Sequence, residues 1–278
     1  FDGAYLSDKL WQVAGVATLI EEFFTQFFCL PYVGPTFVAS ALVGVGLITQ
    51  SIVKKIAPNA NAPLLALLPV ALQIATMVDY DYQYNGIISY IIAVAAIRLY
   101  LQFERQTTKV IASSLLALLL YWAAGPAAIM FVAAIAIYEL FIAPSKAYFT
   151  LLPMAIIAAA GWIAIYYLHL LGEVRYALSP DLYYKPMLQP DKAFYYAWVA
   201  MPIICFIAIL LRRRGEISPA RKLSEVIAQL VVVAMMINFS FKDKEYLQPT
   251  VTKFKELDYY LRYEQWDDAL RLCKEQGV

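Results

Sequence analysis

Charged residues, histidine and cysteine are all scarce in this sequence. Charged residues make up 15% of the chain, whereas soluble domains contain about 25%. His169 is the single histidine, so multi-histidine zinc chemistry is not expected. The three cysteines (Cys29, Cys205 and Cys273) show no spacing typical of a metal site or a disulfide framework. The formal net charge of +1 does not indicate a nucleic-acid partner, and we expect none.

Common nucleotide-binding and hydrolytic motifs are also missing. The sequence contains no Walker loop, no dinucleotide-binding fingerprint, no HExxH zinc motif and no nucleophile elbow. ATP-driven and common hydrolytic activities are therefore not expected.

Apolar residues, in contrast, are abundant and fall into long blocks. Hydrophobic residues make up 62% of the chain. The blocks are about 15–24 residues long, which is the length that crosses a hydrocarbon core as a helix. They lack the alternation of barrel strands, and only helices or closed barrels can span lipid. The sequence therefore predicts an all-α, polytopic transmembrane helical bundle over residues 35–241. About eight spans are expected, at residues 35–53, 63–78, 86–103, 109–123, 126–142, 147–170, 193–211 and 223–240.

A strong helix breaker separates the fourth block from the fifth. Residues 109–142 would otherwise form one apolar stretch far longer than a bilayer requires. Gly125 followed by Pro126 interrupts this stretch. We predict a hairpin of two short spans there, and a re-entrant pair is the alternative.

The N-terminal segment, residues 1–34, is predicted to lie along the outer membrane surface. Apolar residues recur at helical spacing over residues 6–28, but Asp8, Glu21 and Glu22 interrupt them. A helix of this kind favours the interface over spanning the bilayer.

The C-terminal segment, residues 242–278, has a different character. It is predicted to form a tail of two amphipathic helices, a helical hairpin with its break near Glu264. The tail resembles half-repeats of a tetratricopeptide array, in which Trp266 and Ala269 would be the large and small buried residues. One helical pair cannot bury a continuous core, so we expect either further repeats or packing against the membrane domain.

Lysine and arginine residues fall in alternate loops between the expected spans. Because loops rich in these residues stay on the cytoplasmic side, residues 54–62 and 212–222 are predicted inside. Residues 79–85 and 171–192 are then predicted outside. We therefore expect a bacterial inner-membrane protein that contacts membrane lipids and carries its C-terminal tail on the periplasmic side.

The start of the chain resembles an uncharacterised family of polytopic membrane proteins from Bacteroides-like bacteria. The resemblance is carried by Phe1-Asp2, a surface helix, Phe24-Thr25-Gln26-Phe27-Phe28, Pro31 and Gly34. In that family a tetratricopeptide-like tail follows the last span. The layout is similar to that of the GT-C glycosyltransferases, which move a sugar from a polyprenyl-phosphate carrier. This architectural analogy implies a transfer reaction in cell-envelope glycan assembly.

The analogy also directs attention to carboxylates in the first outer segment. In GT-C-like enzymes a carboxylate in this segment activates the acceptor hydroxyl as a general base. Asp2 and Asp8 match that role by location, and they are the catalytic candidates. Glu21 and Glu22 are interpreted instead as the solvated face of the surface helix.

A second polar cluster lies in the loop that follows residue 78. Asp79 and Asp81 could share one divalent cation, because such cations prefer hard oxygen ligands. Neighbouring tyrosines could stack on sugar rings, and the alternative is a solvated loop with tyrosines at the membrane interface. The substrate-binding candidates are Tyr80, Tyr82, Tyr84, His169 and Arg175.

Two charged residues, Arg98 and Glu139, fall within expected spans. Intramembrane charges are costly and are candidates for function. Both lie within a turn or two of the inner boundary, so we expect their side chains to snorkel to the interface.

Three classes of function remain open. The first is an enzyme that transfers a sugar from a polyprenyl phosphate, and the second is a scaffold whose tail recruits an envelope protein. A transporter ranks third, because inverted repeats are not obvious and intramembrane charges are few. A lipid-lined groove with clustered carboxylates would favour the enzyme, and a sealed bundle with an exposed repeat array would favour the scaffold.

Overall fold

The structure is a computed structural model in which the described residues are helical or in connecting loops. It describes residues 2–79, 81–143, 149–185, 190, 192–212, 224, 226–234, 238, 256–257, 260–261 and 265–276. Across these residues there is no strand, and extended backbone pairs only in an isolated bridge between Tyr82 and Tyr184. The chain divides into two compact units, residues 1–236 and residues 237–278. The all-α prediction is confirmed for the described part of the chain.

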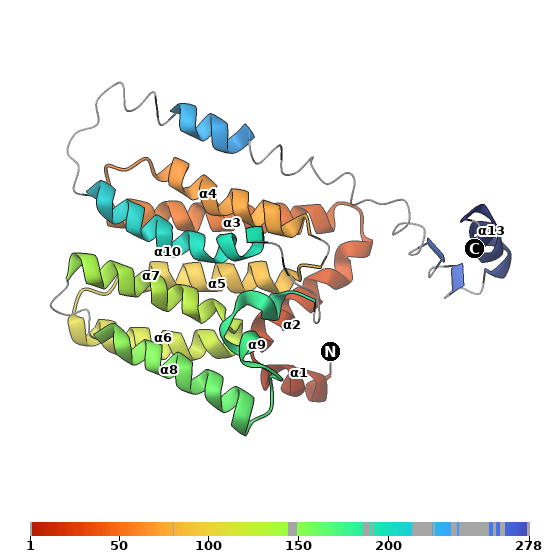
Figure 1. Cartoon of the computed structure of the whole chain (residues 1–278), viewed down its shortest axis with the longest axis horizontal. Helices are drawn as coiled ribbons and strands as arrows, with labels where there is room; N and C mark the ends of the chain where they lie inside the picture. The colour runs from red at the N-terminus through yellow and green to blue at the C-terminus, as the bar shows by residue number, and fades with distance from the viewer. Residues whose placement is uncertain are drawn as a thin grey trace. The chain divides into compact units, whose positions relative to one another are not determined.

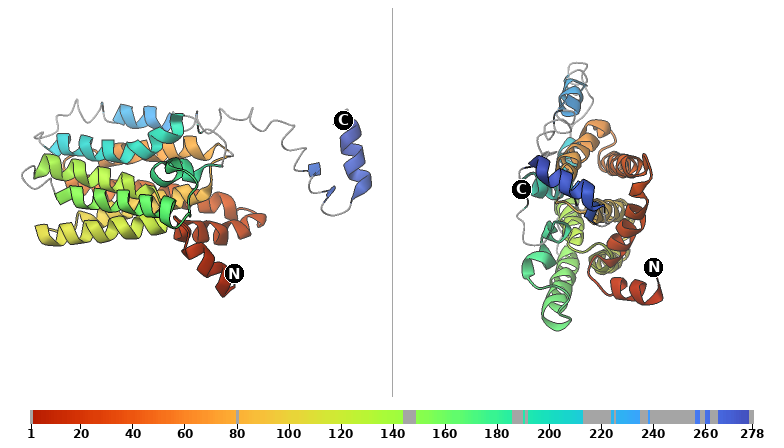
Figure 2. Two further views of the ribbon diagram at one scale, coloured as in Figure 1. Left: turned by 60° about the horizontal axis from the view of Figure 1, so that its bottom comes forward. Right: turned by 90° about the vertical axis from the view of Figure 1, so that its right-hand side faces the viewer.

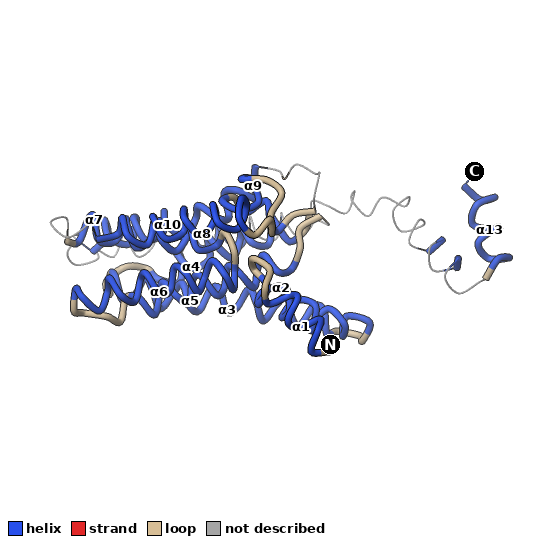
Figure 3. The backbone as a smooth tube through the Cα atoms, turned by 90° about the horizontal axis from the view of Figure 1, so that it is seen from below, coloured by secondary structure: helices blue, strands red, loops and turns tan. Residues whose placement is uncertain are grey.

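The first unit is a bundle of apolar helices that lie side by side (Figure 1). Short helices gather at one end of it, near α9, and Figure 2 shows the same arrangement from two other directions. The bundle helices are α3 (Val33–Ile56), α4 (Ala62–Met77), α5 (Tyr84–Tyr100), α6 (Gln106–Ala124), α7 (Ala127–Ile142), α8 (Leu151–Trp162) with the π-helical turn η3 (Ile163–Tyr167), and α10 (Lys192–Arg212). The short helices are α1 (Gly3–Leu10), α2 (Gly15–Thr25), η1 (Gln26–Cys29), α9 (Val174–Leu178) and η4 (Pro180–Tyr183). Figure 3 shows the bundle helices and their tan connecting loops from below.

The predicted number of eight spans is not supported. Among the described residues, three helices are long and apolar enough to cross a membrane: α3, α6 and the Phe194–Arg212 part of α10. The other apolar bundle helices (α4, α5, α7, and α8 with η3) have 10–17 residues each. Helices therefore occur where spans were predicted, but the polar and Gly-Pro breaks leave several of them short. Within the last predicted span, the described residues 226–234 are helical.

The predicted surface helix over residues 6–28 is in fact two helices. The chain breaks after α1, and Ala14 adopts a left-handed conformation with φ of 61°. Gly15 permits the sharp turn, because a Cβ there would lie 2.1 Å from the Lys9 carbonyl oxygen. An ion pair of 2.8 Å between Lys9 and Glu22 then joins α1 to α2.

The hairpin predicted at Gly125 and Pro126 is confirmed as two helices joined by a tight turn. Gly125 has φ of +61°, which favours glycine. Tyr183, from the distant η4, donates its hydroxyl proton to the Ala124 carbonyl and accepts the Ala127 N–H at 2.9 Å. The α6–α7 turn is therefore closed by a residue almost sixty positions away in the sequence.

Glu139 lies inside the bundle, so the expectation that it snorkels is wrong. The residue is 1% exposed. Its carboxylate forms an ion pair of 2.6 Å with Lys109 of α6 and accepts the Tyr100 hydroxyl of α5 at 2.9 Å. The Glu139 carboxylate is therefore paired with groups inside the bundle and does not extend to the membrane interface.

The second unit contains the helix α13 (Trp266–Gln276). This helix agrees with the second predicted tail helix, whereas the break near Glu264 and most of the first predicted helix lie outside the described residues. Ala269 is buried as expected, but Trp266 is 60% exposed. In the described part of this unit, Trp266 is therefore not buried as the large residue of a tetratricopeptide repeat would be.

Candidate functional site

The outward faces of the bundle are covered by large apolar side chains. They come from α3, α6 and α10 and also from the shorter α8. Exposed apolar side chains on so many helices are typical of a protein in a nonaqueous environment or with a partner. The exposed apolar residues include Val43, Leu47, Ile111, Leu115, Leu118, Leu151, Leu152, Val199, Ile203 and Leu210.

The two ends of the bundle differ in the polar residues that border this surface. At the end where α1 and α2 lie, exposed aromatic residues include Trp11, Tyr32, Trp122, Trp162, Tyr166 and Tyr167. The opposite helix ends carry Lys54, Lys55, Arg105 and Arg212. Tryptophan and tyrosine are typical of the membrane interface, and lysine and arginine of the cytoplasmic side. Both patterns are compatible with a bundle embedded in a membrane.

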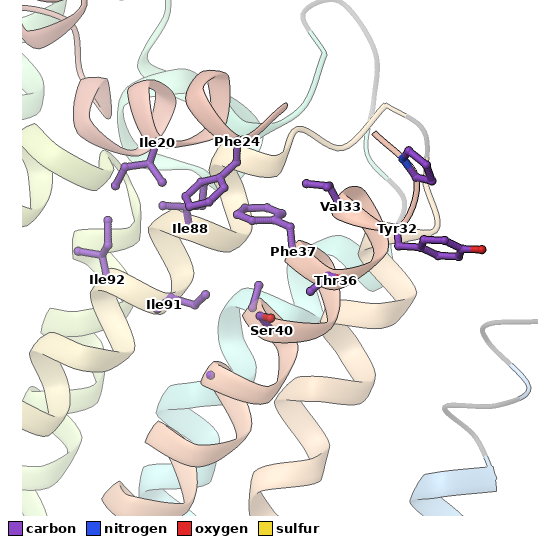
Figure 4. Close-up of a pocket in the computed structure, with 13 residues that line it drawn as sticks. Ile20, Phe24, Tyr32, Val33, Thr36, Phe37, Ser40, Ile88, Ile91 and Ile92 are labelled. Carbon is purple, nitrogen blue, oxygen red and sulfur yellow. The ribbon is translucent and has the colours of Figure 1, made fainter. Parts of the chain in front are cut away.

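A groove of about 740 Å³ opens on this apolar surface between α2, α3 and α5. Figure 4 shows Ile20 and Phe24 of α2 on one side and Ile88 of α5 below them, with Phe37 of α3 between. The groove reaches along α3 to Gly44, where an added Cβ would meet no atom within 4 Å. Its lining consists of Ile20, Phe24, Pro31, Tyr32, Val33, Thr36, Phe37, Ser40, Ala41, Gly44, Ile88, Ile91 and Ile92. An apolar groove with a few hydroxyls suits a hydrocarbon chain.

Glu21 holds the α2 wall of the groove against α5. It is half-buried and lies beside the first turn of α5, where the backbone N–H groups of Asn85 and Tyr84 favour its charged form. Burial raises the pKa of Glu21, with a further contribution from the charge of Glu22, although the two N–H groups oppose this change. Glu21 is therefore only partly solvated, because the first turn of α5 lies beside it.

A second polar centre surrounds Asp181 in η4, which is 3% exposed. Its carboxylate accepts the Arg175 guanidinium at 2.7 Å and the Tyr195 hydroxyl at 2.7 Å, and it also accepts the Ser179 hydroxyl. Burial alone would raise the pKa of Asp181, but these hydrogen bonds and the positive charge of Arg175 hold it below its ordinary value. The centre ties the loop after η3 to α10.

The carboxylates of Asp79 and Asp81 bind side chains of the segment that follows η4. The Tyr184 hydroxyl donates to Asp79 at 2.6 Å, and Lys185 forms an ion pair with Asp81 at 2.8 Å. The Asp81 backbone N–H also donates to the Asp79 carboxylate at 3.0 Å. The described residues contain no group of three or more His, Cys, Asp or Glu side chains that could hold a metal ion. This donor set, with an ammonium already on one carboxylate, does not fit a divalent cation.

The family comparison covers nearly the whole chain. A model described as a family of unknown function, DUF6057, matches residues 1–277. The chain belongs to DUF6057. This agrees with the expected membership of an uncharacterised family. No curated protein and no solved structure matches the chain.

The remaining predicted site residues of this DUF6057 chain are dispersed. Asp2 caps α1 by accepting the Tyr5 N–H at 2.8 Å, and Asp8 accepts the Gln12 side chain at 3.3 Å. His169 is exposed. Tyr80 lies outside the described residues.

The two other predicted tyrosines pack against protein rings. Tyr82 is buried with its ring 5.7 Å from that of Phe194. Tyr84 packs edge-on against Phe28 at 5.4 Å. Neither Tyr82 nor Tyr84 lines the groove.

The sequence signals for Glu21 and Asp181 were weak. Glu21 follows the apolar Ile20 but has an acidic neighbour, Glu22, which suggested a solvated helix face. Asp181 lies in a loop without periodicity, and its partner Tyr195 is fourteen positions away across the start of α10. Only the packing of distant elements brings these groups together.

Proposed function

We propose that this chain is a multi-pass membrane protein that binds the hydrocarbon chain of a lipid-linked substrate in the groove between α2, α3 and α5. The observation that carries this proposal is the apolar groove of about 740 Å³, which opens on the exposed apolar surface of the bundle. A lipid chain could enter it sideways from the bilayer without crossing water. The hydroxyls of Thr36 and Ser40 lie along the same lining.

The proposed setting is the inner membrane of a bacterium, with α1, α2 and α9 on the periplasmic side. The C-terminal tail is proposed on the same side, which requires the segment of residues 226–234 to cross the membrane as well. The basic residues at the opposite helix ends support this orientation. The shorter helices are proposed to be embedded as well. A helix of 16 residues such as α4 is about 24 Å long, and a bilayer accommodates such a mismatch by local thinning. Exposed Leu151 and Leu152 on the short α8 support this placement.

The finer form of the proposal is transfer of a sugar from a polyprenyl-phosphate carrier to an envelope acceptor. Asp2 or Asp8 would serve as the general base, since Asp2 caps α1 and Asp8 lies on it, at the end of the bundle where α2 lies. No step is assigned to a metal ion, because Asp79 and Asp81 already hold Tyr184 and Lys185.

The binding proposal is tested by filling the groove. Purified protein is photocrosslinked to a polyprenyl phosphate that carries a diazirine on its chain. Gly44→Phe is expected to reduce crosslinking several-fold, because the ring would occupy open space, and replacing a helix-interior glycine does not weaken the helix. Leu115→Phe, on the exposed face of α6 away from the groove, is the matched control. Equal crosslinking of wild type and both variants would contradict the proposal.

The transfer proposal has its own test in the native host. Asp2→Asn and Asp8→Asn preserve shape and remove the charge. One of them is expected to change the envelope glycans while the protein is still produced and still crosslinks the lipid probe. Unchanged glycans in both variants would contradict the transfer proposal and would leave the lipid-binding proposal standing.

A scaffold role is the second candidate function. The C-terminal residues 237–278 form a compact unit of their own, and α13 exposes Trp266 and Leu270. This apolar pair supports recruitment of an envelope protein. In-cell crosslinking from position 270 should give a defined protein adduct that Trp266→Ala removes, and a loss of adduct with no change in groove crosslinking would separate the two functions.

A further inference from the structure

The exposed face of α6 carries a continuous apolar stripe that ends at a tryptophan. Its residues recur at steps of three and four positions, which place them on one side of the helix: Ile111, Leu115, Leu118 and Trp122. This helix is among those long and apolar enough to cross a membrane. Trp122 lies two residues before the end of α6, and tryptophan is typical of the boundary between hydrocarbon and headgroups. The stripe therefore ends at the level of the membrane interface.

A hollow of about 530 Å³ lies between α1 and Trp122, and α1 lies beyond this end of α6 (Figure 1). The lining consists of Gly3, Leu6, Ser7, Leu10, Trp11 and Trp122. Residues 3, 6, 7 and 10 share one face of α1, because they are three or four positions apart. Trp11 adds an indole that is 73% exposed. The hollow shares no lining residue with the groove between α2, α3 and α5.

Polar contacts fix α1 with this apolar face beside Trp122. The ammonium of Lys9 pairs with Glu22 of α2 at 2.8 Å, and the Tyr5 hydroxyl donates to the same carboxylate. The indole N–H of Trp122 donates to the Leu10 carbonyl at 2.6 Å, so its ring also has a fixed place. The walls of the hollow are therefore held by contacts of α1 with both α2 and α6.

The lining favours a neutral, largely apolar ligand. Two leucines and two indoles dominate it, and Ser7 supplies a hydroxyl. None of the described residues that line the hollow is charged, and the ammonium of Lys9 is already paired with Glu22. Asp2 and Asp8 of the same segment are acidic and would repel a phosphate. A sugar ring would leave most of its hydroxyls without partners among these side chains, which is costly.

We propose that this hollow binds the ester end of an acyl chain of a phospholipid in the outer leaflet. The rest of the chain would lie along the exposed stripe of α6, which continues from Trp122 toward the hydrocarbon. A helix that places leucine and tryptophan side chains on one face is suited to this interfacial depth. The site rests on the proposed membrane placement, but it depends neither on substrate binding in the groove nor on sugar transfer.

The site is tested on the full chain in phospholipid bilayers. The probe is phosphatidylethanolamine that carries a diazirine on its acyl chain close to the ester, and adducts are expected on α1 and around Trp122. Gly3→Phe should reduce these adducts several-fold, because a Cβ at Gly3 meets no atom within 4 Å and the ring would fill the hollow. Gly172→Phe is the matched control, since Gly172 is exposed, has equally open surroundings and does not line the hollow.

The headgroup should have no influence on the yield of adducts. Phosphatidylglycerol with the same diazirine should label the hollow equally, because the described lining residues carry no charge. A clear preference for phosphatidylglycerol would indicate binding through the headgroup and would overturn the site. Equal adducts in wild type and Gly3→Phe would also overturn it. Displacement of the adducts by a small amount of polyprenyl phosphate would assign the hollow to the substrate and would contradict the proposal as well.

A second measurement does not rely on a variant that fills the hollow. The emission of Trp11 is obtained as the difference between wild type and Trp11→Phe. Lipids brominated near the ester should quench this emission more than lipids brominated near the chain end, and acrylamide in the water should quench it little. Strong quenching by acrylamide alone would place Trp11 in water and overturn the site. Gly44→Phe should change neither measurement even if it abolishes groove crosslinking, so the two lipid sites can fail separately.

Discussion

The two ends of the bundle are built in different ways. At the end that carries α1, α2 and α9, side chains from distant segments complete one another: Tyr183 closes the α6–α7 turn, and Tyr195 meets Asp181. At the opposite end, loops are short and the main polar feature is the ion pair of Glu139 with Lys109 inside the helices.

This difference separates an end that contains the groove from an end that contains a buried ion pair. The first end is assembled from short helices and contains the groove, and Glu21 lies on the α2 helix that forms one wall. The opposite end is fixed by a buried charge pair that leaves little freedom to the helices around it. Under the proposed function, lipid binding belongs to the first end, and four substitutions test the contrast.

The largest effect is expected from the buried ion pair. Glu139→Gln should lower the free energy of unfolding by about 3–5 kcal/mol, because it leaves the ammonium of Lys109 in the bundle without a counterion. The measurement is denaturant unfolding in detergent. The double variant Glu139→Gln with Lys109→Met removes both charges and should recover most of this loss; a double variant as unstable as the single one would contradict the account.

The next largest effect is expected at the other end, from Tyr183→Phe. The hydroxyl of Tyr183 serves the Ala124 carbonyl and the Ala127 N–H, both fully buried. Its removal leaves two backbone groups unpaired, at a cost of about 2–3 kcal/mol in unfolding free energy. Tyr166→Phe is the control, since Tyr166 is exposed and should give no change. A Tyr183→Phe protein as stable as wild type would mean that the turn does not depend on this residue.

The helical character and the α6–α7 hairpin could be predicted because they depend on local signals. Apolar block length and the Gly125–Pro126 break are properties of neighbouring residues, and the structure has helices at those places. The predicted number of membrane-crossing helices is not supported, because block length in the sequence does not fix where α4, α5 and α7 begin and end.

The polar contacts of the candidate site could be predicted only in part. Arg175 was selected, but its partner Asp181 was not, since that pairing depends on how the loop folds onto α10. Glu21 was assigned to solvent because the sequence cannot show that α5 begins opposite it. The groove could not be predicted from the sequence either, because its lining combines residues of three helices that are separate in the sequence.

A smaller effect with a defined pH dependence is expected from Asp181→Asn. The folded-state pKa of Asp181 is held below the ordinary value of 3.8. Its charge therefore contributes stability that is fully present above that value and is lost as the pH falls through the lower folded pKa. At neutral pH, Asp181→Asn should cost about 1.5 kcal/mol through weaker hydrogen bonds. The thermal stabilities of variant and wild type should converge in acid, and a constant difference from pH 7 to pH 3 would contradict this.

The smallest effect is expected at Glu21, where the sign is opposite. Burial raises the folded-state pKa of this carboxyl, so its ionised form opposes folding. The folded state is therefore favoured as the pH falls through the raised pKa, and the advantage disappears as the pH rises above it. Glu21→Gln keeps an oxygen for the Tyr84 and Asn85 N–H groups and should be as stable as wild type, or slightly more stable, at pH 7. Glu21→Ala loses the cap and should cost about 1 kcal/mol of unfolding free energy.

Because Ile20 and Phe24 on the same helix line the groove, Glu21→Ala should also reduce groove crosslinking while Glu21→Gln should not. Thermal unfolding between pH 4 and pH 7, run beside the crosslinking assay, checks both, and equal behaviour of the two variants would show that α2 is held in place by other contacts.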